Sequence, residues 1–213
     1  MTERTTLCAS DTRKDVTLSP DVFESVDTRG FPKRTNMGVR CSATELLMYD
    51  LVVLTGDVDD AVTSAGGWLC DRVRAGWRVT VCAPQKSDFR PLQILGVHTS
   101  SIDDETDFLC NTSAAAIAVA GDVLGTDKRV RDEIRRIVKR GTAEVTFWGD
   151  GGSFAADIRF SRVAHRLSFA ARAFKAQAAA SASIPASSVS VHEEFRSCAM
   201  WYSPEGADLT PAS

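Results

Sequence analysis

The sequence predicts an α/β domain built on a doubly wound, mostly parallel sheet with helices on both faces. The apolar run at 49–55 shows no alternation, which is typical of a strand buried on both faces. Apolar residues at helical spacing follow from Asp60, and a β-branched run follows at 77–83. Strand, helix and strand in this order predict a βαβ unit, whose crossover is nearly always right-handed.

The remaining segments extend this pattern. The sequence predicts a short strand over 91–100, an acidic loop over 101–107, helices over 108–125 and 127–141, a strand over 142–148, a long amphipathic helix over 160–182 and a strand or hairpin over 188–204. In the long helix, Val163, Leu167, Ala171 and Phe174 are expected to face inward. His192, flanked by two glutamates, is interpreted as part of a solvated strand end.

Composition limits the classes of function. The chain has 213 residues, 44% of them hydrophobic and 25% charged, as in ordinary globular proteins. A net charge of -3 argues against general nucleic-acid binding. No apolar stretch is long enough to span a membrane, and the polar start does not resemble a signal peptide. We therefore expect a cytoplasmic protein with no nucleic-acid or membrane partner, and six scattered cysteines that remain free thiols.

Three regions are expected along the chain. Residues 1–43 lack periodicity and are interpreted as an irregular N-terminal arm, residues 44–204 as the α/β domain, and residues 205–213 as a loose tail. The arm is long enough to join two copies of the chain, so a homo-oligomer through it is left open beside a loosely packed leader.

Carboxylates gather where the first predicted strand ends. Asp57, Asp59 and Asp60 follow it directly, and like charges this close need compensation by a cation or a helix N-terminus. One of them could serve only as a helix cap, but three indicate a site. Gly149-Asp150 forms a similar corner after a later strand, and ligands of open α/β sheets bind at such ends.

Several common sites are missing from the sequence. It has no G-x-G-x-x-G fingerprint, no complete phosphate loop and no G-x-S-x-G elbow, so no nucleotide cofactor and no hydrolase serine is expected. Acidic side chains at a strand end favour a cation or a polar, hydroxylated substrate instead.

The stretch "VVLTGDVDDAVTSAGGWLCDRVRAGWRVTVCAP" at 52–84 resembles the opening of the PIG-L/LmbE-like zinc N-deacetylases. In that family the first strand ends in a His-Pro-Asp-Asp-Glu motif, followed by a helix of small residues and a second strand. Weaker similarity at "LGVHTSSIDD", "AEVTFWGD" and "VHEEFRSCAMWYSP" extends the resemblance over about 47–204.

The resemblance implies roles for individual residues. Asp59 matches the general base and Asp60 a metal ligand, while Asp57 stands where the family has the first ligand histidine. The family's later His-Pro-Asp-His motif is not recognisable, and His165 is the histidine nearest to it. Another register would place Asp157 and Phe160 there. His98 and Asp150 are the candidates for substrate binding.

An Asp57, Asp60 and His165 set would hold a divalent ion and leave positions for water. With a carboxylate in place of an imidazole, the preference would shift from zinc towards manganese, magnesium or iron, and the bound water would ionise less readily. The function expected is a divergent metal-dependent amidohydrolase that acts on a small polar N-acyl substrate. A metal-free enzyme or small-molecule binder of the same fold, and a non-catalytic partner subunit, are the alternatives.

Overall fold

The computed structural model describes residues 39–40, 48–101, 109, 112–185, 189–198 and 209–212. Its strands are β1 (Val39–Arg40), β2 (Met48–Leu54), β3 (Arg78–Ala83), β4 (His98–Ser101), β5 (Ala116–Ala120), β6 (Glu144–Trp148), β7 (Ser161–Arg166), β8 (His192–Cys198) and β9 (Thr210–Pro211). Its helices are α1 (Val58–Arg74), α2 (Arg90–Ile94), α4 (Gly121–Thr126), α5 (Lys128–Arg140), α6 (Phe169–Ser181) and the short 3-10 helix η1 (Gly152–Phe154).

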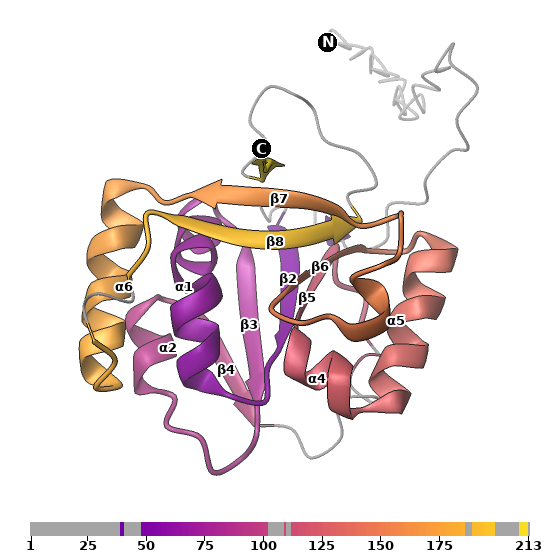
Figure 1. The fold of residues 1–213 in the computed structure, drawn as a ribbon. Coiled ribbons are helices and arrows are strands. Elements are labelled where there is room, and N and C mark those ends of the chain that lie inside the picture. Colours follow the sequence, from indigo (N-terminus) through magenta and orange to yellow (C-terminus); the bar gives the residue numbers. More distant parts are fainter. Residues whose placement is uncertain are drawn as a thin grey trace, which may run out of the picture. The chain divides into compact units, whose positions relative to one another are not determined.

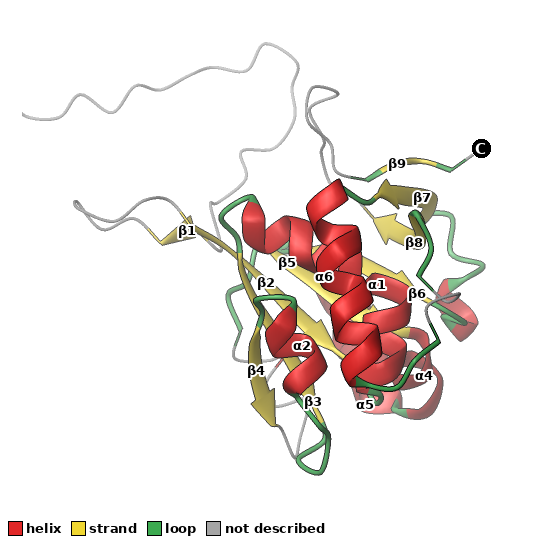
Figure 2. Cartoon of the chain, turned by 90° about the vertical axis from the view of Figure 1, so that its left-hand side faces the viewer, coloured by secondary structure: helices red, strands yellow, loops and turns green. Residues whose placement is uncertain are grey.

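The strands form a sheet in the order β4-β3-β2-β5-β6-β8-β7-β9, with β1 beside β2 (Figure 1; β1 and β9 are labelled in Figure 2). The five strands from β4 to β6 are parallel, and Leu51 of β2 is level with Val79 of β3 and Ala116 of β5. Strands β8, β7 and β9 continue the sheet in antiparallel pairs, and β1 pairs antiparallel with β2. The predicted α/β fold with a mostly parallel sheet is confirmed.

The direction in which the chain crosses the sheet reverses at β2. Strands β3 and β4 lie on one side of it, whereas β5 and β6 lie on the other. Because these crossovers are right-handed, the reversal places α1 and α2 on one face of the sheet and α4 and α5 on the other. Helix α6 packs against α1 and α2, and all three lie on the same side of the sheet in Figure 2. The carboxyl ends of β2 and β5 therefore flank a topological switch point, where doubly wound sheets bind ligands.

The first βαβ unit forms where the sequence predicts it. Strand β2 is buried along Leu51–Leu54, as an apolar run inside a parallel sheet requires. Helix α1 begins at Val58, with Asp57 as its N-cap, and turns small and apolar residues such as Ala65 and Leu69 into the core. Helix α5, with Val130 and Ile134 buried, and strands β6 and β8 also match the predicted segments.

Three predicted elements are wrong in type. The segment 108–125, predicted as a helix, contains the fully buried strand β5 and the short helix α4. The segment 160–182 is not one helix, because β7 occupies its first part and α6 begins at Phe169, capped by Ser168. Phe174, expected inside, is 44% exposed. The segment 91–100 forms most of α2 before the strand β4.

The predicted domain boundaries stay predictions. Within 1–43 the structure describes only β1, and within 205–213 only 209–212, so most of the arm and more than half of the tail lie outside the described residues. The acidic loop at 101–107 also lies almost entirely outside them. Cys70, Cys82 and Cys198 are buried free thiols. In the described part of the chain, no helix combines the length and apolar character that crossing a membrane needs.

Candidate functional site

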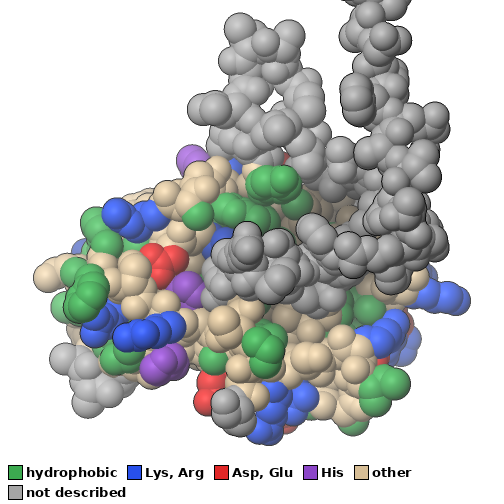
Figure 3. All heavy atoms as spheres, turned by 90° about the horizontal axis from the view of Figure 1, so that it is seen from above, with side chains coloured by type: hydrophobic (Ala, Val, Ile, Leu, Met, Phe, Trp, Pro, Cys, Tyr) green, Lys and Arg blue, Asp and Glu red, His purple; other side chains and the backbone are tan. Residues whose placement is uncertain are grey.

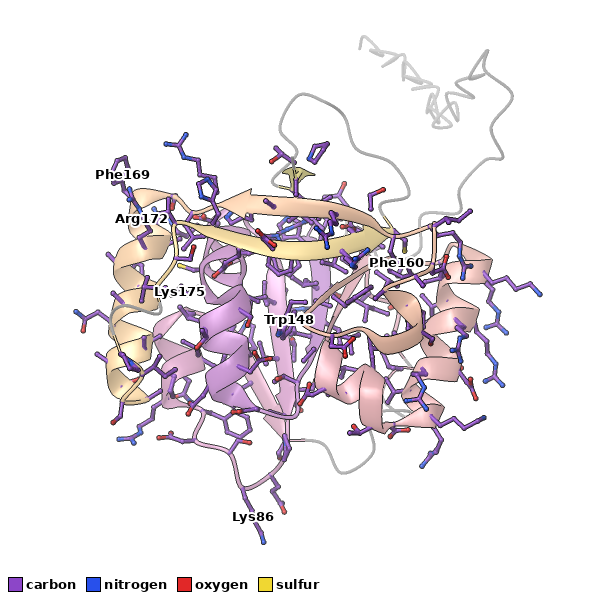
Figure 4. All side chains as sticks on the ribbon, viewed as in Figure 1. Lys86, Trp148, Phe160, Phe169, Arg172 and Lys175 are labelled. Atoms are coloured by element: carbon purple, nitrogen blue, oxygen red, sulfur yellow. The ribbon has the colours of Figure 1, made fainter. Side chains whose placement is uncertain are left out.

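Aspartates follow three neighbouring parallel strands at the same edge of the sheet. Asp57 comes after β2, Asp122 after β5 and Asp150 after β6. Asp59 and Asp60 lie in the first turn of α1 beside them. We call these five residues the switch-point cluster. They lie at the carboxyl ends of the strands, the end of the sheet where Lys86, in the loop after β3, is labelled in Figure 4.

Two glycines allow the three strand ends to approach one another. A Cβ atom on Gly56 would lie 2.7 Å from Oδ2 of Asp122, and one on Gly121 would lie 2.6 Å from the backbone oxygen of Asp150. A larger residue at Gly121 would push the backbone of β5 and of the turn after β6 apart, whereas one at Gly56 would displace the Asp122 side chain. The missing side chain of Gly121 therefore allows the chain after β5 to lie against the chain after β6, and Gly56 leaves room for the Asp122 carboxylate.

Asp57 and Asp59 differ in how they are held. The Asp57 side chain accepts a hydrogen bond from the backbone N–H of Asp59 at 2.9 Å and so caps α1. The Thr55 hydroxyl donates to the Asp57 carbonyl at 2.6 Å and fixes the turn. Asp59 is exposed, and its carboxylate accepts no hydrogen bond from any described residue. Asp59 is therefore free to act on a ligand.

Asp60 is held from two sides. Its Oδ1 accepts a hydrogen bond from the Ser64 hydroxyl at 2.9 Å, one helical turn further along α1. Its Oδ2 accepts one from the indole N–H of Trp148 at 2.7 Å, so the last residue of β6 reaches across to α1. Asp60 is half-buried and Trp148 is buried.

Asp122 and Asp150 complete the cluster from the other strands. Each accepts a hydrogen bond from a nearby backbone N–H, Asp122 from Val123 at 2.7 Å and Asp150 from Gly152 at 3.0 Å. Both are exposed. Among the described residues no Lys, Arg or His forms an ion pair with a member of the cluster. The negative charge gathered here is balanced by no neighbouring cation in that part of the chain.

Asp122 is the member that sequence reasoning missed. It lies in the segment 108–125, where a helix was expected instead of a strand end. A signal was present, because Gly121-Asp122 follows an apolar run just as Gly56-Asp57 and Gly149-Asp150 do. Three Gly-Asp corners after three buried strands would have marked the whole cluster.

The structure does not bring His165 to the cluster. It lies in β7, buried, with Nε2 2.9 Å from Oδ2 of Asp71 in the last turns of α1. That position is roughly 16 Å along the helix axis from Asp60, at 1.5 Å per residue. The Ser168 hydroxyl donates to the same carboxylate at 2.6 Å. Although burial raises the pKa of Asp71, the hydrogen bonds from Ser168 and His165 hold it below its usual value.

His98 and the alternative pair also lie apart from the cluster. His98 is exposed at the first residue of β4, so it lies at the amino end of that strand. Asp157 pairs with Arg159 at 2.6 Å, and the hydrogen bonds from Arg159 lower the pKa of Asp157 to about 2. Phe160 is buried against Phe147 and Phe154. Of the two predicted substrate-binding residues, only Asp150 lies at the switch point.

The opposite end of the strands differs in charge. Figure 3 shows the molecule from the side of β7, where Lys and Arg side chains are prominent around the described surface and few carboxylates are visible. Arg162 and Arg166 of β7 are exposed on this side. A cationic ligand is therefore favoured at the switch-point cluster.

The described side chains do not fit the divalent ion that the resemblance implies. No group of three His, Cys, Asp or Glu side chains in the described ranges is placed to hold a metal ion. Asp57 caps α1, both oxygens of Asp60 accept hydrogen bonds, and His165 bonds to Asp71 instead. The predicted ligand set Asp57, Asp60 and His165 is thus not assembled at one place.

Comparison with known proteins gives a match in structure alone. No protein-family model and no curated protein sequence matches the chain. Among solved structures, a deacetylase–teicoplanin complex from teicoplanin biosynthesis superposes with a TM-score of 0.52 and 12% identity, covering 70% of this chain and 97% of that one. The zinc-inhibited form of teicoplanin deacetylase Orf2 gives a TM-score of 0.46 and 13% identity, covering 61% and 82%. The A40926 pseudoaglycone deacetylase Dbv21 gives 0.44 and 15%, covering 61% and 79%. The first of these shows that the chain shares the fold of a deacetylase.

Proposed function

We propose that this chain is a hydrolase of the N-deacetylase type that cleaves the amide of a small polar N-acyl substrate at the switch-point cluster. One observation carries the proposal. Five aspartates follow three neighbouring strand ends, form no ion pair with a described residue, and lie at the edge where open α/β sheets bind ligands. The deacetylase fold supports the same reaction class by analogy.

Asp59 is the general base in this proposal. Its carboxylate is exposed and accepts no described hydrogen bond, so it can take a proton from a water molecule that attacks the amide carbon. As the C–N bond breaks, the nitrogen takes up a proton and leaves as an amine, and the acyl group leaves as a carboxylic acid.

The charge of the cluster suits the products of this reaction. An alkyl amine is cationic at neutral pH, whereas the acid is an anion. The carboxylates attract the first and repel the second. We therefore expect substrates whose free amine binds more tightly than the acylated form, with hydroxyl or amino groups that can donate to Asp122 and Asp150.

The proposal assigns no step to a metal ion. The resemblance implies a divalent ion (zinc, manganese, magnesium or iron) with Asp57 in place of a histidine ligand. The described side chains do not assemble such a site. A cytoplasmic location and a homo-oligomer through residues 1–43 remain part of the proposal and need separate measurement.

A specific observation favours a second candidate, a small-molecule-binding protein without catalysis. Asp57 and Asp60 both serve the structure, one as a helix cap and the other as the acceptor of two side-chain hydrogen bonds. If Asp59 is not placed against an amide in the complex, the cluster would bind amines and leave them unchanged.

The test uses a panel of N-acetylated amino sugars and polyamines, with release of free amine followed by an amine-reactive dye. We expect Asp59→Asn to lower the rate by about 100-fold or more while the protein folds normally. The matched control is Asp127→Asn, which changes an N-cap aspartate of α5 outside the cluster and should leave the rate unchanged.

The outcomes separate the candidates. If no N-acyl compound is hydrolysed but free amines bind and Asp59→Asn weakens the binding, the second candidate replaces the first. If neither hydrolysis nor amine binding is found, both are wrong.

A further inference from the structure

The indole of Trp148 is the buried group most directly connected to the switch-point cluster. Trp148 ends β6, is 2% exposed, and donates its N–H to Oδ2 of Asp60 at 2.7 Å. An indole nitrogen is a donor only, and a bond this short to a carboxylate is of the strong, charge-assisted kind. In Figure 4 the residue is labelled in the interior of the molecule. Trp148 therefore needs Asp60 as the acceptor of its buried N–H, and Asp60 needs Trp148 as the donor that holds Oδ2.

The second oxygen of Asp60 is engaged as well. Ser64 donates to Oδ1 at 2.9 Å from within α1, while Trp148 donates to Oδ2 from the sheet. Donors from two different elements fix the rotamer of the carboxylate beside Asp59. Asp60, in the first turn of α1, is thereby tied to the end of β6.

A divalent ion at Asp60 would have to compete with these two donors for the carboxylate oxygens. A divalent ion bound to Oδ2 would lie about 2 Å from that oxygen and close to the positive end of the N–H bond. Moving Asp60 away to reach an ion would leave a buried N–H without an acceptor, which is costly. The described residues also offer no set of three ligands here.

We propose that Trp148 is a positioning residue that holds the Asp60 carboxylate by an N–H donor and keeps it from ligating a metal, so that the switch-point cluster works without a divalent ion. Only the expected effect of Trp148 on catalysis rests on the proposed function. Its effect on metal affinity can be measured whether or not the chain is a hydrolase.

The decisive variant is Trp148→Phe, which removes the N–H and keeps an aromatic ring in the core. Titration calorimetry with MnCl2 and with ZnCl2 should show no saturable binding to the wild type up to millimolar concentrations. Trp148→Phe should show saturable binding of at least one of the two ions, with half-saturation at least tenfold below that concentration limit. The matched control is Trp68→Phe, which trims another buried tryptophan, in α1, and should leave the weak metal affinity unchanged.

A second variant keeps the inference testable if Trp148→Phe does not fold. Ser64→Ala releases Oδ1 from a half-buried position and should raise metal affinity in the same direction, to a smaller extent. In the deacylation assay, Trp148→Phe should lower kcat about tenfold with KM nearly unchanged, because Asp60 is released beside the base while the ligand contacts remain.

Two results would overturn the inference. One is stoichiometric, Asp60-dependent binding of a divalent ion by the wild type. The other is a metal affinity that neither Trp148→Phe nor Ser64→Ala changes. A lack of hydrolysis combined with the expected metal titrations would refute the proposed function and leave the role of Trp148 supported.

Discussion

Helix α1 meets acidic side chains in two regions that differ in solvation and in charge balance. At its amino end, the switch-point cluster is exposed or half-buried and forms no ion pair with a described residue. In its middle, Glu193 of β8 is 3% exposed and forms an ion pair with Lys175 of α6 at 2.6 Å. From the sequence, the strand end around His192 was interpreted as solvated. That interpretation is wrong for Glu193, which is buried.

The buried pair is joined to the helix backbone. The Glu193 carboxylate accepts the N–H groups of Gly67 and Trp68 at 2.8 and 2.7 Å, and Lys175 (labelled in Figure 4) donates to the Thr63 carbonyl at 2.5 Å. In an α-helix the N–H of residue 67 faces the carbonyl of residue 63, one turn earlier. Glu193 and Lys175 therefore contact two backbone groups of the same turn of α1. Burial raises the pKa of Glu193, and the Lys175 charge and the two N–H groups act against that rise.

The buried pair and the switch-point cluster are expected to serve different purposes, the first the stability of the fold and the second the binding of a ligand. A buried carboxylate without partners would be strongly destabilising, and both oxygens of Glu193 accept hydrogen bonds, from α1 and from Lys175 of α6. The carboxylates of the cluster stay hydrated, so their unbalanced charge does little harm to folding and remains free for a cationic ligand. We therefore expect substitutions in the middle of α1 to change stability and substitutions at its amino end to change binding or rate.

The largest effect is expected from Lys175→Met. It leaves Glu193 buried without its cation and should lower the free energy of unfolding by about 3–5 kcal/mol, measured by urea denaturation. Adding Glu193→Gln removes the second charge and should recover part of that loss. The control Lys139→Met changes an exposed lysine of α5 and should stay within about 0.5 kcal/mol of the wild type. Equal effects of Lys175→Met and Lys139→Met would show that the pair does not stabilise the fold.

A smaller loss is expected from Gly67→Ala. The added methyl would lie 2.2 Å from Cδ2 of Leu167 and 3.1 Å from Oε1 of Glu193, so the buried Leu167 side chain or α1 has to shift, at a cost of about 1–3 kcal/mol. Gly125→Ala is the matched control in α4, where no other heavy atom lies within 4 Å of the new methyl. It should be neutral or stabilising by up to about 1 kcal/mol, because alanine is the better helix former. If both variants melt at the wild-type temperature, the close approach at Gly67 is not needed.

The sequence predicts elements well where local and tertiary preferences agree. Strand β2 and helix α1 show the apolar run and the helical spacing that their burial requires, and Asp57 follows as a cap. Strand β5 was missed because alanine favours helices, whereas its place between β2 and β6 decides the outcome. In β7, the buried residues Val163 and His165 alternate with exposed or half-buried ones, a period of two that the prediction of one long helix passed over.

Only those features of the site that depend on a single segment of the sequence could be predicted. Asp57, Asp59, Asp60 and Asp150 were placed at strand ends by the residues around them. The bond between Asp60 and Trp148 joins positions 88 apart in the sequence, and that between His165 and Asp71 joins positions 94 apart. No local pattern encodes such contacts, because the order of the strands in the sheet decides which side chains meet.

The smallest expected effect concerns Cys70, whose thiol lies in α1 next to both Asp71 and the buried pair. Burial, with the Asp71 and Glu193 charges adding to it, raises the pKa of Cys70 from 9.0 to about 11. Between these values the unfolded chain has already released the thiol proton and the folded chain still holds it, so stability falls as the pH rises. We expect the wild type to lose on the order of 1 kcal/mol more than Cys70→Ala between pH 9 and pH 11. Urea denaturation at a series of pH values gives the slope of the free energy of unfolding against pH for each protein. The loss of packing caused by removing the sulfur is the same at every pH, so it does not affect the difference between the two slopes. Parallel slopes would mean that the thiol ionises equally in both states, and that the low polarity around the buried pair does not extend to Cys70.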